Sequence, residues 1–433
     1  MTTLPERRPA VRRSTIVVGK LVRALARLRG GGSALPGLVI ERRDPGFVPS
    51  VLAQLPRGVV VVSGTNGKTT TTKMVTELLQ SQGLKVFTNR TGSNFVRGVA
   101  AALVAEVDFK GRLDADIAVL ELDEAHAVHF VKLVRPRHSL LLNVMRDQLD
   151  RFGEIDTTAR MLQAIAEATT DGVVLNREDP RVAALADHVA GRDVAWFGFD
   201  PSLAHIFPSD NDLHSGPSPA AEPTRAADVE LAGVEGDRGS FVIEGRLVEV
   251  DLALRGVHNV FNAAAALALV RQVAGDRLDG PALLTALSQV TPAFGRGEQV
   301  EVDGQPVELV LVKNPAGFRL SLASFPSEGH ATMIAINDQY ADGRDMSWLW
   351  DVSFEALRET GVAQVTGTRA WDMALRLKYD DVPVAAVEPD LADALRAFLR
   401  EHADAPKRIF TTYTAMLALR KELARITDVE EVA

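Results

Sequence analysis

Cysteine is absent from this chain of 433 residues. Its absence excludes disulfides, thiolate zinc sites, iron–sulfur clusters and cysteine nucleophiles. Long apolar runs are also missing: no stretch approaches the roughly 20 residues of a membrane-spanning helix, and no apolar signal-peptide core follows the basic N-terminus. A net charge of −9 argues against sequence-independent binding of nucleic acid. We expect a cytoplasmic protein of roughly two or three domains.

Near the N-terminus, residues 14–29 carry apolar side chains at helical spacing, with basic ones between them. The apolar positions are Val18, Leu21, Val22, Leu25 and Leu28. This pattern predicts an amphipathic helix, which Gly30–Gly32 would end. Two interpretations stay open: the helix packs on the next domain with its charges in water, or it contacts an anionic membrane surface.

The rest of the chain has the pattern of an α/β protein. Apolar strands are predicted at 59–62, 117–120, 139–142 and 173–175, with helices between them, which favours a parallel sheet. A Pro-rich stretch at 201–228 reads as a linker, and a helix is expected at 259–273. Further strands at 307–312 and 332–336 and a helix after Thr414 belong to a second α/β segment. We divide the chain into 1–57, 58–299 and 300–433.

A turn between the first strand and its helix has the composition of a phosphate-binding loop. It reads Gly64-Thr65-Asn66-Gly67-Lys68-Thr69-Thr70. Its glycines allow backbone N–H groups to face phosphate oxygens at a helix N-terminus. We expect Lys68 to reach the β- and γ-phosphates of ATP and the Thr69 hydroxyl to bind Mg²⁺. The first glycine of the usual P-loop pattern is replaced by Val62, so this is a variant of that loop.

This variant loop resembles that of the Mur ligase superfamily, and other segments of the superfamily follow in the same order. They are Thr88–Asn94, Glu121–Ala125, Asp147–Gly153, Asn176 with Asp179-Pro180, Gly256–Asn259 with Asn262, and Phe294–Glu298. The resemblance implies a central ATP-binding domain and a smaller C-terminal α/β domain. It implies that Glu121 binds Mg²⁺, with Glu124 in reserve, and that Arg296 and Asn259 serve the nucleotide. For Asn259 a helix N-cap is an equal alternative.

Within the superfamily, four segments resemble the MurT branch: Asp147–Glu154, Gly31–Gly37, Asn337–Trp348 and Thr412–Met416. This resemblance implies ATP-dependent amidation of the D-glutamate α-carboxylate in the peptidoglycan stem peptide of lipid II, through an acyl phosphate. It places the catalytic aspartate at Asp351, with Asp345 second; the other interpretation of Asp351 is a cap on a helix near Ser353. Triad glutaminases need a cysteine, so ammonia from glutamine would require a partner, which in this branch is the amidotransferase GatD.

The sequence departs from the family in ways that matter for cofactor and substrate. Many relatives carry a four-cysteine zinc ribbon, whereas the stretch here offers only His205 and His214, so no zinc is expected. The helix at 156–169 lacks the lysine that some Mur ligases carbamylate. About sixty residues precede the phosphate loop, too few for a UDP-sugar-binding domain, which favours a lipid-linked substrate. The alternatives are a ligase that adds an amino acid, like folylpolyglutamate synthase, and a P-loop NTPase that drives assembly.

Overall fold

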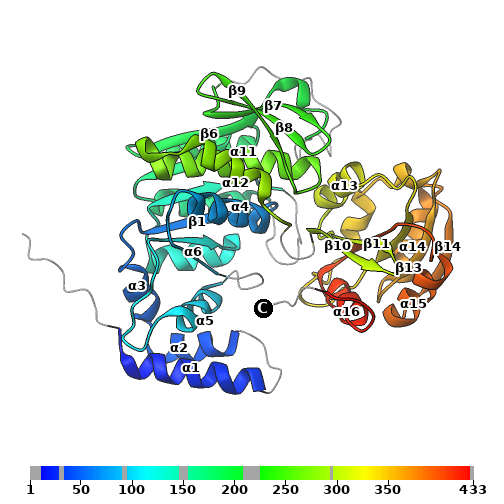
Figure 1. The fold of residues 1–433 in the computed structure, drawn as a ribbon, viewed down its shortest axis with the longest axis horizontal. Coiled ribbons are helices and arrows are strands. Elements are labelled where there is room, and N and C mark those ends of the chain that lie inside the picture. The colour runs from blue at the N-terminus through cyan, green and yellow to red at the C-terminus, as the bar shows by residue number, and fades with distance from the viewer. Residues whose placement is uncertain are drawn as a thin grey trace, which may run out of the picture.

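The computed structural model describes residues 11–28, 34–89, 95–145, 155–207, 225–292 and 296–429. They form two α/β bodies, each built on its own sheet (Figure 1). The predicted α/β fold is therefore confirmed. The predicted segments at 30–32, 90–94, 147–153, 208–224 and 294–295 lie outside the described residues.

The first sheet has nine strands in the order β2-β3-β1-β4-β5-β6-β7-β8-β9. Strands β1 to β7 pair in parallel, and four of them, β1, β3, β4 and β5, lie where the buried apolar runs predict strands. Strands β7, β8 and β9 pair antiparallel, an addition that the sequence did not predict because these strands are only partly buried. The strands are β1 (Val59–Ser63), β2 (Val86–Thr88), β3 (Ile117–Glu121), β4 (His138–Leu141), β5 (Gly172–Asn176), β6 (Asp193–Phe199), β7 (Val229–Glu235), β8 (Arg238–Ile243) and β9 (Arg246–Asp251).

Helices cover both faces of this sheet, and strand β1 shows how. Val60 and Val62 face one core with α4, α11 and α12, while Val59 and Val61 face a second core with α3, α5, α6 and α8. Alternate residues of a strand point to opposite faces, so a strand buried on both sides is apolar throughout. The helices are α1 (Arg13–Leu28), α2 (Ala34–Arg43), α3 (Phe47–Leu52), α4 (Lys68–Ser81), α5 (Val96–Glu106), α6 (Glu124–Leu133), α8 (Ile155–Ala168), α9 (Pro180–Ala183), α11 (Val257–Ala274) and α12 (Gly280–Gln289).

The second sheet has six strands in the order β10-β11-β15-β12-β13-β14, with only β10 antiparallel to its neighbour. Its two faces bury separate cores. The strands are β10 (Arg296–Val302), β11 (Gln305–Leu311), β12 (Ala331–Ala335), β13 (Val362–Thr366), β14 (Val384–Glu388) and β15 (Lys407–Thr411). The helices are α13 (Pro315–Ser324), α14 (Ala370–Tyr379), α15 (Leu391–Glu401), α16 (Tyr413–Leu423) and the short 3₁₀ turns η4 (Ser347–Asp351) and η5 (Glu355–Leu357).

Helix α1 forms at the predicted place and packs on α2 and α5 at one end of the molecule (Figure 1). The predicted inward face is wrong in part. Ile16 and Gly19 are buried, whereas Leu21 and Leu25 are 59% and 49% exposed. No helix among the described residues is long and apolar enough to cross a membrane.

Candidate functional site

The phosphate loop lies at the carboxyl end of β1, which pairs in parallel with β3 on one side and β4 on the other, and leads into α4. Two glycines in it have positive φ: +135° at Gly64 and +85° at Gly67. A Cβ on Gly64 would lie 2.9 Å from the Asn143 backbone nitrogen, and one on Gly67 would lie 2.6 Å from Asn262 Oδ1. The positive φ angles and the close neighbours of both positions therefore require glycine, so the loop has a specific backbone shape that an ordinary turn does not need.

Asn143, just after β4, holds the loop in shape. Its Oδ1 accepts from the Asn66 amide at 2.8 Å, its Nδ2 donates to the Asn66 carbonyl at 3.1 Å, and its carbonyl accepts from the Thr65 amide at 3.0 Å. Two hydrogen bonds anchor the segment around Asn143. Asn176 Nδ2 donates to the Leu142 carbonyl, and Asp179 Oδ2 accepts from the Val144 amide. Burial raises the pKa of Asp179. The Asn176 and Asp179 motif thus supports the loop from behind.

Lys68 is the first residue of α4 and is buried, with 7% of its surface exposed. Its Nζ lies 3.3 Å from the Thr65 carbonyl and 3.3 Å from Glu124 Oε2. The side chains of both members of this ion pair are almost fully buried. Glu124, the reserve metal candidate of the sequence analysis, is therefore the charge partner of Lys68.

Thr69 and Glu121 form the other polar pair of the site. The Thr69 hydroxyl donates to Glu121 Oε1 at 2.9 Å, and Glu121 is buried at the end of β3. Asn89 fixes the Glu121 backbone through two hydrogen bonds of 2.7 and 2.9 Å. Thr70 is buried in the first turn of α4. Among the described residues no three His, Asp or Glu side chains gather as a metal cage.

Two residues of the second body reach the phosphate loop. Lys313 Nζ donates to the Thr65 carbonyl at 3.0 Å, and Asn314 Nδ2 donates to Asn66 Oδ1 at 2.9 Å. Asn314 also caps α13, because its Oδ1 accepts from the Gly317 amide at 2.8 Å. Sequence reasoning missed both residues. The available signal was a Lys-Asn-Pro run directly after a strand, where side chains at the carboxyl edge of a parallel sheet meet a ligand.

Helix α11 meets the loop from the other side. Its N-cap is Gly256, with φ of +100°, so the N-cap alternative for Asn259 is wrong. Asn259 is 1% exposed and its Nδ2 donates to the Arg255 carbonyl at 2.7 Å. One turn later, Asn262 Nδ2 donates to Asn259 Oδ1 at 3.4 Å, and the Asn262 side chain lies against Gly67. The two asparagines place amide groups beside the phosphate loop.

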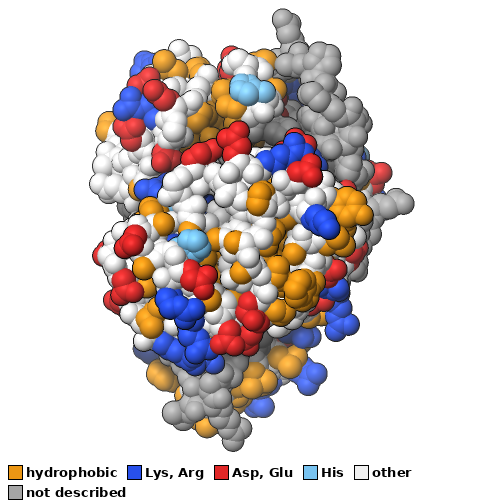
Figure 2. Space-filling model, turned by 90° about the vertical axis from the view of Figure 1, so that its right-hand side faces the viewer, with side chains coloured by type: hydrophobic (Ala, Val, Ile, Leu, Met, Phe, Trp, Pro, Cys, Tyr) orange, Lys and Arg blue, Asp and Glu red, His pale blue; other side chains and the backbone are white. Residues whose placement is uncertain are grey.

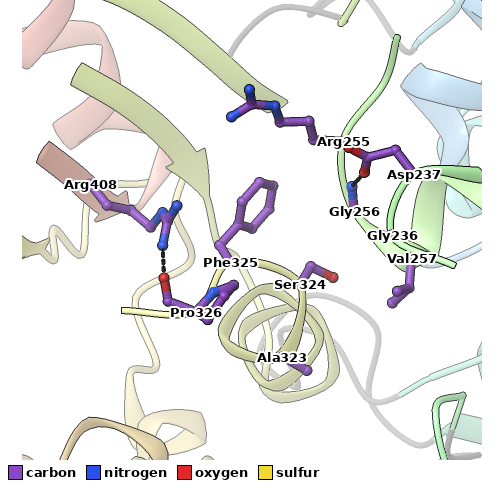
Figure 3. A pocket seen from close by; sticks show the side chains of 10 residues that line it. All are labelled: Gly236, Asp237, Arg255, Gly256, Val257, Ala323, Ser324, Phe325, Pro326 and Arg408. Carbon is purple, nitrogen blue, oxygen red and sulfur yellow. Dashed lines mark hydrogen bonds between the residues drawn. The ribbon is translucent and has the colours of Figure 1, made fainter. Parts of the chain in front are cut away.

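A pocket of about 380 Å³ opens between the two bodies at the start of α11 (Figure 3). One side is formed by Asp237, which accepts from the Gly256 amide at 3.0 Å, and by Arg255. The other side is formed by Phe325 and by Arg408, which donates to the Pro326 carbonyl. Arg408 also pairs with Glu308 at 2.9 Å inside the second body.

The three aspartates of the segment 342–351 in the second body differ in their surroundings. Asp342 is buried and holds the N-terminus of α16 through the Thr414 amide at 2.7 Å; burial raises its pKa. Asp345 accepts from the Ser347 side chain and amide, which lower its pKa.

Asp351 is exposed at the end of η4. The expected helix near Ser353 does not form; η5 begins at Glu355 with Phe354 before it and no side-chain cap, so the capping interpretation of Asp351 is wrong. Arg319, on α13, donates to the Asp351 carbonyl. Burial lowers the pKa of Arg319, and the Asp351 charge partly offsets this effect.

Asn314, which contacts the phosphate loop, stands at the start of the same helix as Arg319. The five-residue separation is about 7 Å along the helix axis, so Asp351 is linked to the loop through α13. Arg296 is the first residue of β10, and its side chain lies outside the described part of the structure.

Comparison with known proteins agrees with this geometry. Residues 62–270 match the Mur ligase middle domain, and residues 311–416 match the MurT ligase C-terminal family. The MurT subunit of lipid II isoglutaminyl synthase (glutamine-hydrolyzing) from Streptococcus pneumoniae is 31% identical, over 92% of this chain and 94% of the relative. Its namesake from Staphylococcus aureus strain COL is 30% identical, over 88% and 91%.

Solved structures share the fold at lower identity. MurF from Acinetobacter baumannii has a TM-score of 0.69 at 18% identity and covers 90% of this chain and 80% of its own. Folylpolyglutamate synthase of Mycobacterium tuberculosis, complexed with ADP and AMPPCP, has a TM-score of 0.60 at 17% identity and covers 97% of both chains.

Proposed function

The chain belongs to the MurT family of Mur-type ligases, and from this membership we propose that it amidates the D-glutamate α-carboxylate of the lipid II stem peptide with ATP and ammonia. The observation that carries the proposal is the match to MurT relatives over almost the whole length of both chains. The phosphate loop, which is shaped by Asn143 and approached by Lys313, supplies the matching chemistry.

ATP is the expected nucleotide. Backbone N–H groups of Gly67–Thr70 and the dipole of α4 would face the phosphates, since the glycines keep this space free of side chains. Lys68 lies where the β- and γ-phosphates would replace the carbonyl oxygens as its partners. Asn259 and Asn262, whose amides lie beside the phosphate loop, would contact the nucleotide, and Arg296 extends the expected ATP-binding set.

The residues fit Mg²⁺. The Thr69 hydroxyl and the Glu121 carboxylate are hard oxygen donors 2.9 Å apart, and Mg²⁺ is commonly held by one or two carboxylates together with substrate phosphates and waters. Glu124 is a weaker candidate because it neutralises Lys68. Mg²⁺ in this place would neutralise charge on the transferred phosphoryl group.

The reaction follows in two balanced steps. A carboxylate oxygen of the substrate forms a bond to the γ-phosphorus as the bond to the leaving ADP oxygen breaks, which yields an acyl phosphate and ADP. Lys68 and Lys313 supply positive charge from opposite bodies, and each donates a hydrogen bond to the Thr65 carbonyl. Such preorganised charge is the main source of catalysis in phosphoryl transfer.

In the second step the ammonia nitrogen attacks the acyl carbon, phosphate leaves, and a proton leaves the nitrogen. We assign the orientation of ammonia and the removal of its proton to Asp351, with Asp345 as the second candidate. Asp351 is exposed and connects to α13 through Arg319, whereas Asp345 is engaged by Ser347. An exposed carboxylate on the surface of the second body suits ammonia that arrives from another protein.

That other protein is a GatD-like glutamine amidotransferase. The chain has no cysteine, so it lacks the nucleophile with which triad glutaminases release ammonia. The curated relatives are named as subunits of a glutamine-hydrolysing enzyme. We place the protein at the inner face of the membrane, where a lipid-linked substrate is found.

The test is reconstitution with a GatD-like subunit, lipid II, ATP and glutamine, followed by mass spectrometry of the stem peptide. Amidated stem peptide that depends on all four components supports the function. The likeness to folylpolyglutamate synthase gives the competing function, an amino-acid ligase. Phosphate release that depends on an added amino acid, without any partner, would favour that ligase.

A further inference from the structure

The N-terminal part of the chain has a net positive charge, whereas the rest of the chain is net negative. Residues 1–43 hold ten Lys or Arg and two Asp or Glu, a net charge of +8. The whole chain carries −9, so the other 390 residues carry −17. The described portion of this segment forms α1 and α2, which lie together at one end of the molecule (Figure 1). Seven of these basic residues lie in the described residues 11–28 and 34–43, which hold one acidic residue, so α1, α2 and the residues just before α1 form a basic region.

Helix α1 presents an aliphatic stripe to solvent. Val17, Leu21 and Leu25 are spaced four residues apart and are 52%, 59% and 49% exposed. Residues at this spacing share one face of a helix. Phe109, 65% exposed, lies beside the helix, because Lys20 Nζ is 5.4 Å from its ring centroid. We call these four apolar residues the α1 stripe.

The opposite face of α1 is fixed to the domain. A Cβ on Gly19 would lie 2.6 Å from Val104 Cγ2 and 2.9 Å from Ile40 Cδ1, so α1 packs closely against α5 and α2. The Thr15 hydroxyl also donates to Asp44 Oδ2 at 2.9 Å. The helix cannot turn its leucines inward without losing these contacts. The α1 stripe is consequently held outward by the fold.

Basic side chains border this stripe. Arg12 and Arg13 are exposed at the start of α1, and no acidic residue occurs in the described span 11–28. Figure 2 shows orange and blue side chains at the lower end of the molecule, where α1 lies in Figure 1, with red ones higher up. Aliphatic side chains framed by positive charge are the pattern of helices that lie in the interface of anionic bilayers.

We propose that the α1 stripe and its surrounding basic residues dock the protein on an anionic lipid bilayer. The inference rests on the proposed function, because a lipid-linked substrate is presented at such a surface. A protein partner is the weaker occupant: a stable protein interface buries about 800 Å² per partner around a central cluster, whereas this face offers a narrow stripe between cations. Val17, Leu21 and Leu25 would enter the boundary of head groups and acyl chains.

The experiment measures binding of the full-length chain to vesicles by flotation. One vesicle contains phosphatidylglycerol mixed with phosphatidylcholine, and the other contains phosphatidylcholine alone. The stripe variant is Val17→Ser/Leu21→Ser/Leu25→Ser. The matched control is Leu247→Ser/Leu375→Ser/Ile426→Ser, which removes three side chains of 62%, 49% and 59% exposure elsewhere. A charge variant, Arg12→Gln/Arg13→Gln, tests the electrostatic part.

We expect the wild type and the control to bind phosphatidylglycerol vesicles and to bind phosphatidylcholine vesicles much less. The stripe variant should bind at least about tenfold more weakly, and the charge variant and added salt should weaken binding as well. Wild-type binding that is absent, or a stripe variant that binds as tightly as the control, would overturn the proposal.

The same proteins are assayed for amidation of lipid II in detergent micelles with the glutaminase. We expect the stripe variant to keep wild-type amidation there, because the stripe is remote from the phosphate loop. A wild type that binds vesicles but amidates nothing refutes the proposed function and leaves the docking surface standing. A stripe variant that loses amidation in micelles and melts at a lower temperature than the control refutes the docking role.

Discussion

Replacing Glu121 by Gln tests the metal site with little change of shape. The Gln side chain has almost the same size and retains an oxygen that can accept from the Thr69 hydroxyl, now 2.9 Å away. The backbone of residue 121 stays clamped by Asn89. What the substitution removes is the negative charge at the end of β3.

The size of the effect follows from the two roles of that charge. Charge stabilisation by a bound metal is worth several kcal/mol at the transition state. Losing a charged ligand should therefore cost about 3 kcal/mol, roughly a 150-fold fall in kcat/KM at fixed Mg²⁺. For stability, the Thr69 hydrogen bond changes from a charged to a neutral acceptor, which costs about 1 kcal/mol. Activity should thus fall far more than stability.

Glu124→Gln is the matched comparison. It leaves the buried Lys68 ammonium without its charge partner, which we expect to lower the free energy of unfolding by about 3 kcal/mol. The assay titrates Mg²⁺ against amidation at saturating ATP and records the melting temperature of both variants. We expect a raised Mg²⁺ requirement for Glu121→Gln and a lowered melting temperature for Glu124→Gln. A raised Mg²⁺ requirement in Glu124→Gln alone would refute the assignment.

Three further outcomes are expected. Lys313→Met removes the cation of the second body that donates to the Thr65 carbonyl. The acyl-phosphate step should slow by about 100-fold in single-turnover kinetics while ATP still binds. An unchanged rate would show that Lys313 does not act in the site. Asp351→Asn should block amide formation but keep ATP and partner binding, and normal amidation would shift the role to Asp345. Burial lowers the pKa of His138 to about 4. The neutral ring therefore contributes stability above pH 6.5, on the order of 3 kcal/mol, that is lost as the pH falls towards 4. His138→Gln should reduce this loss of unfolding free energy at acid pH, measured by urea unfolding, and an unchanged loss would contradict the assignment.

The local parts of the fold were predictable. Val59–Val62 and the glycine-rich turn after them predicted β1, the phosphate loop and α4 almost to the residue, since a buried strand must be apolar on both faces and a phosphate cradle must lack side chains. Features that depend on tertiary packing could not be predicted. The direction in which Leu21 points depends on Gly19 packing against α5, and the pattern of α1 alone contains no such signal.

The same limit applies to the site. Thr69 follows β1 and Glu121 ends β3, two neighbouring parallel strands whose carboxyl ends lie side by side. Their pairing could therefore be predicted from the sequence. The contact of Lys313 with Thr65 joins residues 248 positions apart on different bodies. Glu124 shows a further difficulty: sequence placed it beside the metal, and only its distance to Lys68 assigns it to the lysine.

The central claim is that the chain activates a carboxylate as an acyl phosphate before nitrogen attacks it. The most direct measurement uses lipid II whose D-glutamate α-carboxylate carries heavy oxygen, incubated with the chain, a GatD-like glutaminase, ATP and glutamine. Acyl phosphate formation transfers one carboxylate oxygen to phosphate, so each amide formed should release one labelled phosphate, detected by mass spectrometry. Amide formation that releases only unlabelled phosphate would contradict the mechanism.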